Sequence, residues 1–121
     1  MVPQDRLDQL TKAVYDLVHE RDWHQFHTPK NLSAKISIEA AELLEILVWT
    51  HEKDVAALIE KNKQEIKHEL ADVMISLLMF CNATNLDLYE AVLEKLEEIK
   101  KKYPVDQVKG KPYKYTYYTK K

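Results

Sequence analysis

Two pairs of acidic residues, each pair three positions apart within an apolar stretch, are the residues best suited to chemistry. The stretch SIEAAELLEILVW contains Glu39 and Glu42, and HELADVMISLL contains Glu69 and Asp72. Two like charges 4 Å apart repel by about 1 kcal/mol in water and by about 4 kcal/mol at an effective dielectric constant of 20. Burial adds a desolvation penalty, so a cluster of these carboxylates requires a cation. All-oxygen ligand sets suit hard cations such as Mg²⁺ and Mn²⁺.

Helical periodicity is what would bring the two pairs together. Successive residues of a helix rotate by about 100°, which puts Glu39 inside an apolar stripe with Ile36 and Leu43 and puts Glu42 to one side. Glu69 borders a similar stripe on a second helix. Each pair alone also fits a solvated helix face, because a chain with 20 acidic residues in 121 contains such spacings by chance.

The elements that must position these residues are predicted to be helices. The chain has one glycine and four prolines, and the prolines lie outside the periodic stretches. Pro29 disfavours helix at Thr28, so the second helix is expected to start near Asn31 or Ser33, both good N-caps, while Asp87 is the expected N-cap of the last helix. The helices are predicted over residues 4–22, from 31 or 33 to about 50, 54–61, 64–84 and 88–102.

The predicted fold class is all-α, a compact bundle of four to five helices with a non-helical C-terminal arm. Within the arm, YKYTYY alternates enough to predict a short strand or an extended segment. We expect residues 1–104 to form the helical domain and residues 105–121 the tail. From residue 100 onward the chain has eight lysines and one acidic residue. Interleaved with tyrosines, these fit a nucleic-acid arm, but the acidic body favours an arm that wraps a partner subunit.

Composition limits the remaining classes of function. The 121 residues suit one domain, and 18 basic against 20 acidic residues argue neither for a nucleic-acid polymer nor for a membrane surface. Cys81 is the single cysteine, so it forms no intramolecular disulfide and is expected to be a buried thiol in a reducing, cytoplasmic setting. The polar N-terminus has no hydrophobic signal region, and the longest apolar stretch, VMISLLMF, is too short to span a bilayer.

Four segments in order, RDWHQFHTPKNL, EAAELLEILVW, ELADVMISLL and KLEEIKKKYP, resemble the MazG-like nucleoside triphosphate pyrophosphohydrolases. The resemblance covers about residues 5–104 and is closest to the small all-α branch that includes the dCTP pyrophosphatases. It implies a homodimer or homotetramer and hydrolysis of (deoxy)nucleoside triphosphates to monophosphate and pyrophosphate. It also implies Mg²⁺, with Mn²⁺ as a possible substitute, and attack of a metal-activated water on the α-phosphorus.

The resemblance also implies site residues. The metal ligands are Glu39, Glu42, Glu69 and Asp72, and Glu39 and Glu42 are the candidates to accept the proton of the water. Lys95 matches a lysine that faces the phosphates and is the third catalytic candidate. Aromatic residues around the base and polar residues at the second helix start complete the expected substrate contacts: Trp23, Phe26, His27, Lys30, Asn31, Trp49, Ser76 and Lys95.

Two departures from the family pattern and two alternative functions stay open. Ile99 stands where the family commonly has a polar residue, and Ser76 stands where members that prefer dCTP tend to have an aromatic one. A ferritin-like di-iron bundle is one alternative, because Glu65 and His68 have the Glu-x-x-His spacing of such sites, although no second motif follows. A non-catalytic helical interaction module is the other. The sequence leaves open the preferred nucleotide, the number of metals per site, dimer against tetramer, and removal of damaged nucleotides against control of a normal pool.

Overall fold

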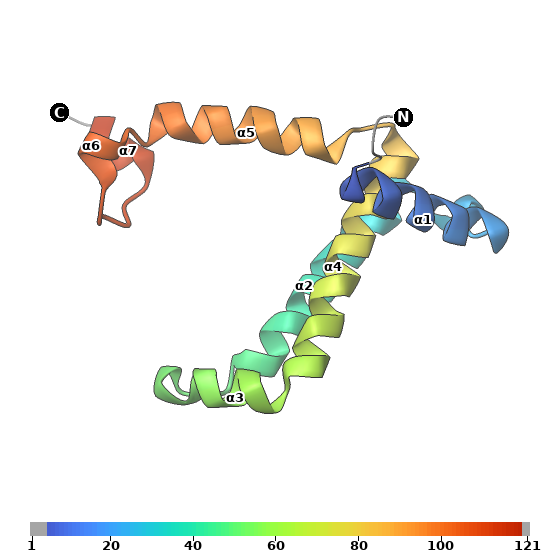
Figure 1. The fold of residues 1–121 in the computed structure, drawn as a ribbon, viewed down its shortest axis with the longest axis horizontal. Helices are drawn as coiled ribbons and strands as arrows, with labels where there is room; N and C mark the ends of the chain where they lie inside the picture. Colours follow the sequence, from blue (N-terminus) through green and yellow to red (C-terminus); the bar gives the residue numbers. More distant parts are fainter. Residues whose placement is uncertain (1–4, 120–121) are drawn as a thin grey trace. The chain divides into compact units, whose positions relative to one another are not determined.

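The computed structural model describes residues 5–119, and all of its regular secondary structure in that range is helical (Figure 1). This confirms the predicted all-α class. Gln4, at the predicted start of the first helix, and Lys120 and Lys121 of the predicted tail lie outside the described residues. The chain divides into two units, Met1–Leu86 and Asp87–Lys121.

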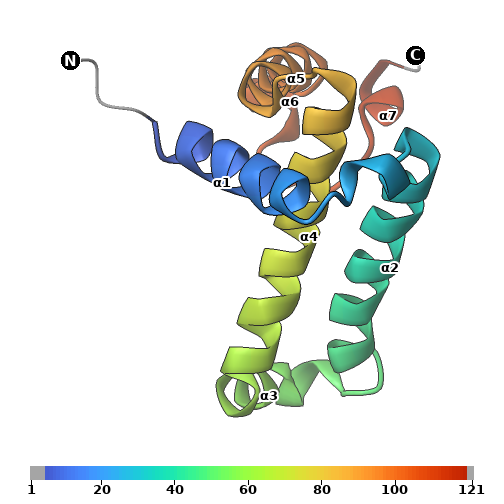
Figure 2. The same ribbon diagram turned by 90° about the vertical axis from the view of Figure 1, so that its right-hand side faces the viewer.

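The first unit is built on two long helices that lie side by side and run in opposite directions (Figures 1 and 2). The elements are α1 (Arg6–Glu20), η1 (His24–Phe26), α2 (Pro29–Leu47), η2 (Glu52–Asp54), α3 (Val55–Lys61) and α4 (Lys63–Thr84). The two long helices are α2 and α4. Helix α1 packs on α4, and the short helix α3 connects the pair at the other end.

Helix α2 begins earlier than predicted, and its cap explains why. Thr28 is the N-cap, because its hydroxyl oxygen accepts from the backbone N–H of Asn31 at 3.1 Å. Pro29 occupies the first helical turn, where its missing N–H costs nothing and its fixed φ favours the helix. The predicted start at Asn31 or Ser33 is therefore wrong. Pro29 restricts only the residue before it, and that residue is the extended cap itself.

The core of this unit lies where the helices cross. Leu32 of α2 and Leu78 of α4 are each 1% exposed, and burial of such a side chain contributes about 1.5–3 kcal/mol. Cys81 is buried with them, as predicted. The other buried core residues are Val14 and Val18 of α1 and Met79 of α4. The acidic residues lie further along the same packed pair of helices, after Leu32 on α2 and before Leu78 on α4.

The second unit comprises α5 (Leu88–Lys102), α6 (Val105–Val108) and α7 (Tyr115–Thr119). Asp87 caps α5 as predicted, since its carboxylate accepts from the N–H of Glu90 at 3.0 Å. The prediction of a non-helical arm with an extended YKYTYY segment is wrong. The N–H of Tyr115 donates to the Tyr103 hydroxyl at 3.0 Å, and the two rings meet edge to face. This tertiary contact at the start of α7 overrides the alternating local pattern.

None of the described helices combines the length and the apolar character that a bilayer crossing requires.

Candidate metal and nucleotide site

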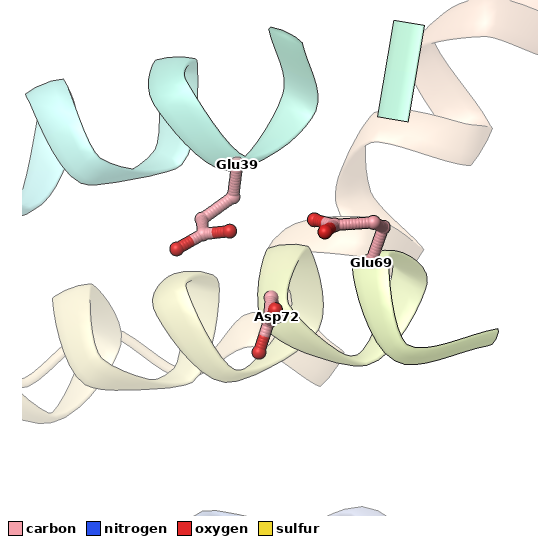
Figure 3. Close-up of side chains that lie close together, drawn as sticks. All are labelled: Glu39, Glu69 and Asp72. Atoms are coloured by element: carbon pink, nitrogen blue, oxygen red, sulfur yellow. The ribbon is translucent and has the colours of Figure 1, made fainter. Parts of the chain in front are cut away.

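Three carboxylates converge between the two long helices. Glu39 projects from α2 toward α4, and Glu69 reaches from α4 toward it, with Asp72 one turn further along (Figure 3). Each of the three offers an oxygen that lies within 4.8 Å of the oxygens of the other two. The sequence prediction that the two acidic pairs face each other is thus realised for these three residues, because α2 and α4 are antiparallel.

The environment of Glu39 suits a cation. Its side chain is only 13% exposed, and its Oε1 accepts from the Lys35 ammonium at 2.9 Å. This hydrogen bond lowers the pKa of Glu39, against the opposite effect of burial. Its other oxygen, Oε2, and the Oε2 of Glu69 are buried without a hydrogen-bond partner. Unpaired buried carboxylate oxygens are costly, and all-oxygen donors fit Mg²⁺ or Mn²⁺.

Glu42 lies one turn after Glu39 on α2. The neighbouring Glu39 carboxylate raises the pKa of Glu42, and burial and the charge of Glu69 add to the shift. Glu42 and Glu69 also line a groove of about 400 Å³, together with Glu45, Ile46 and Glu65. The groove gives solvent and ligands access to the carboxylates from the side on which Glu42 lies.

A second pocket lies between α1, η1 and α4. It has a volume of about 250 Å³ and is lined by Tyr15, Val18, His19, His24, His27, Met79, Asn82 and Ala83. Its residues on α4 follow Asp72 by 7 to 11 positions, which is about 10–16 Å along a helix. The rings of Tyr15, His19 and His24 stack in succession, at centroid distances of 3.7 and 4.7 Å.

His27 of this pocket is biased toward its neutral form. Burial lowers its pKa, and the positive charge of Lys35 and the neighbouring His24 lower it further. The pocket therefore combines aromatic faces, an imidazole with a lowered pKa and an amide. Tyr15, His19 and Asn82 were missed from the sequence, although the i, i+4 spacing of Tyr15 and His19 on one helix face was readable.

Comparison with known proteins shows the family to which this chain belongs. The model of the MazG-like family matches residues 34–117, a segment that includes all four predicted metal ligands. The chain belongs to the MazG-like family. The resemblance inferred from the sequence is confirmed.

Relatives of this MazG-like chain include dCTP pyrophosphatase 1 from Mus musculus, which is 32% identical over 116 residues. The match covers 94% of this chain and 68% of the mouse protein. The human protein of the same name is 29% identical over the same shares of the two chains. Among solved structures, the crystal structure of a pyrophosphatase from Archaeoglobus fulgidus is 38% identical, with a TM-score of 0.81. That match covers 86% of this chain and 97% of the archaeal one.

In this MazG-like chain the aromatic candidates for base contact are exposed. Trp23 and Phe26 lie in the link before α2 and are 44% and 62% exposed, and Trp49 follows α2 and is 89% exposed. The structure does not bring Trp49 together with the other two.

The polar candidates divide into two groups. Lys30 and Asn31 lie in the first turn of α2, and the Asn31 side chain donates to the Phe26 carbonyl at 3.1 Å, which fixes the link onto the helix. Ser76 is fully buried, and its hydroxyl donates to the Asp72 carbonyl at 2.8 Å. Ser76 thus contacts its own helix rather than either pocket.

Lys95 belongs to α5 in the second unit, where its ammonium pairs with Glu98 at 3.0 Å. Its approach to the phosphates therefore remains a prediction. The di-iron alternative gains no support from the first unit. The His68 ring there contacts the Gln64 amide at 2.8 Å, and the one carboxylate cluster identified within residues 5–119 contains no histidine.

Proposed function

We propose that this MazG-like protein hydrolyses nucleoside triphosphates to monophosphate and pyrophosphate in a reaction that depends on Mg²⁺ or Mn²⁺. The observation that carries the proposal is the convergence of Glu39, Glu69 and Asp72, with two buried carboxylate oxygens that have no partner. The relatives named dCTP pyrophosphatase 1 and pyrophosphatase support the same class of reaction.

The four carboxylates would hold the metal. Glu39, Glu69 and Asp72 supply oxygens from two helices, and Glu42 borders them on the open side. Bound Mg²⁺ would supply positive charge that offsets the phosphate oxygens and would lower the pKa of a nearby water. Without a cation, the acidic groove would repel a triphosphate.

Glu42 is the residue that we assign as general base. Its pKa is raised by Glu39 and Glu69, and a carboxylate with a raised pKa accepts a proton more readily at neutral pH than an ordinary one. It lies on the groove side of the cluster, where a water that attacks the α-phosphorus has access. Glu39 is the second candidate, although its bond to Lys35 makes it the weaker base.

The nucleoside end of the substrate fits the pocket beyond Asp72. We propose that the base enters the space between α1, η1 and α4, where His27 and the stacked rings offer aromatic faces. Stacking of a base on an aromatic side chain is worth about 1–3 kcal/mol. The offset along α4 is of the order of the length of a nucleoside triphosphate. Trp23 and Phe26 lie in the same link as His24 and His27 of this pocket, and Lys30 and Asn31 lie at a helix N-terminus that favours anions.

We propose that a second subunit contributes to the assembled protein. No residue of α5 is buried, and most of its large apolar side chains are exposed, for example Val92 at 49% and Leu96 at 45%. We propose a homodimer or homotetramer in which this face is covered. We further propose that residues 1–104 carry catalysis, with Lys95 facing the phosphates, and that residues 105–121 contact the partner.

Product analysis tests the proposed function. A panel of deoxynucleoside and nucleoside triphosphates is incubated with the full chain and Mg²⁺, and the products are separated by anion-exchange chromatography. We expect monophosphate and pyrophosphate in equal amounts, no reaction in EDTA, and a loss of at least 100-fold in Asp72→Asn, since removing even a partner of a metal ligand typically costs 10- to 100-fold. Nucleoside diphosphate and inorganic phosphate as the first products would contradict the proposal.

A further inference from the structure

Within residues 5–119, Lys35 is the one basic residue that forms an ion pair with the acidic cluster. Among the ion pairs within residues 5–119, only the Lys35–Glu39 pair involves one of the four carboxylates. The ammonium bonds Glu39 Oε1 at 2.9 Å, and the Lys35 side chain is 41% exposed. Its contact is therefore close, but its stem has room to move toward solvent.

The position of Lys35 links the two halves of the site. It lies one turn before Glu39 on α2, on the side of the chain link that carries His27. Lys35 lowers the pKa of Glu39 and also that of His27. His27 lines the pocket beyond Asp72. Along the chain, Lys35 thus lies between His27 of the pocket and Glu39 of the cluster, the two places that the phosphate chain of a bound nucleotide would connect.

We propose that Lys35 is a positioning residue that neutralises Glu39 in the free protein and turns to the phosphate oxygens of the nucleotide once a divalent cation binds the carboxylates. This inference rests on the proposed function. Metal and nucleotide would then bind cooperatively. The metal releases the Lys35 ammonium from Glu39, and the nucleotide phosphates bind the released ammonium.

The proposal predicts effects of opposite sign on the two ligands. A single positive charge near the cluster repels a free divalent cation, so its removal should tighten binding of Mn²⁺ alone by roughly tenfold. The same charge attracts phosphate oxygens, and loss of a charge-assisted hydrogen bond should weaken nucleotide binding by at least about tenfold. Replacement of a residue with only a structural role would weaken binding of both Mn²⁺ and the nucleotide.

The test compares Lys35→Met with wild type, with Lys35→Arg and with a matched control, all as the full chain. Methionine keeps the aliphatic stem and removes the charge. Lys12→Met is the control, because Lys12 also pairs with an acid four residues on, Asp16, but on α1. Binding of Mn²⁺ alone is measured from the free-ion electron paramagnetic resonance signal. Binding of α,β-methylene-dCTP at saturating Mn²⁺ is measured by calorimetry.

In Lys35→Met we expect tighter Mn²⁺ binding and weaker analogue binding, whereas Lys35→Arg and Lys12→Met stay close to wild type. If both affinities of Lys35→Met fall together, or neither changes, while wild type binds Mn²⁺, the inference about Lys35 is overturned and the metal site stands. If wild type fails to bind Mn²⁺ at all, the proposed metal site itself is overturned, and the role of Lys35 with it.

Discussion

Replacement of Glu69 by glutamine should stabilise the metal-free protein while it removes activity. Glu69 offers an oxygen within 4.8 Å of oxygens of Glu39 and Asp72. Two charges at 4.8 Å repel by about 0.9 kcal/mol in water and by about 3.5 kcal/mol at an effective dielectric constant of 20. Because the cluster borders an open groove and Lys35 offsets part of the charge, we expect a gain near the lower value, about 1 kcal/mol.

The assay is thermal unfolding in EDTA and in Mg²⁺. A gain of about 1 kcal/mol should raise the melting temperature of a chain of this size by about 4 °C in EDTA. In Mg²⁺ at 100 times its Kd, wild type should gain about 2.7 kcal/mol by mass action, and Glu69→Gln should gain much less. Activity of the variant should fall at least 100-fold, because even the partners of metal ligands typically contribute 10- to 100-fold.

Glu60→Gln is the matched control, because Glu60 is an exposed residue of α3 that pairs with Lys63 at 3.9 Å. It should change neither the melting temperature nor the response to Mg²⁺. Glu65 is unsuitable as a control, since it lines the same groove as Glu69. An unchanged melting temperature in EDTA together with full activity of Glu69→Gln would refute the reasoning and leave the carboxylates as a solvated face.

Three further predictions concern pH and assembly. The pKa of Glu42 is raised in the folded protein, so the stability that Glu42 contributes to the metal-free protein should be lost as the pH rises above about 4.5; chemical denaturation should show a different pH dependence in Glu42→Gln. The pKa of Glu98 is lowered to about 2 by Lys102 and Lys95, so the stability from these pairs is present above pH 4.5 and is lost as the pH falls toward 2; a carboxyl titration midpoint near 4.5 by NMR would contradict this. Light scattering at micromolar concentration should give at least a dimer, whereas a monomer would leave the exposed face of α5 unexplained.

The helices and the acidic cluster could be predicted because their signals are local. Apolar periodicity and the scarcity of glycine defined α1 to α5, and the spacing of Glu39, Glu69 and Asp72 gave each residue its helix face. The antiparallel pairing of α2 and α4 then follows from the short connection through α3. The family resemblance narrowed the chemistry further, and it was confirmed.

The errors and omissions arose where the structure depends on contacts distant in sequence. The start of α7 depends on a hydrogen bond between Tyr115 and Tyr103, twelve residues apart, which alternation within YKYTYY does not encode. The pocket around His27 combines residues from α1, η1 and α4, and no single stretch shows it. Lys35 had a local signal, its i, i+4 spacing from Glu39, but that spacing is common on solvated helices.

The position of bond cleavage tests the central claim most directly. The protein is incubated with dCTP and Mg²⁺ in water enriched in ¹⁸O, and the monophosphate and pyrophosphate are analysed by mass spectrometry. Attack of water on the α-phosphorus predicts one ¹⁸O atom in the monophosphate and none in the pyrophosphate. Label in the pyrophosphate, or release of dCDP and labelled inorganic phosphate, would contradict attack on the α-phosphorus.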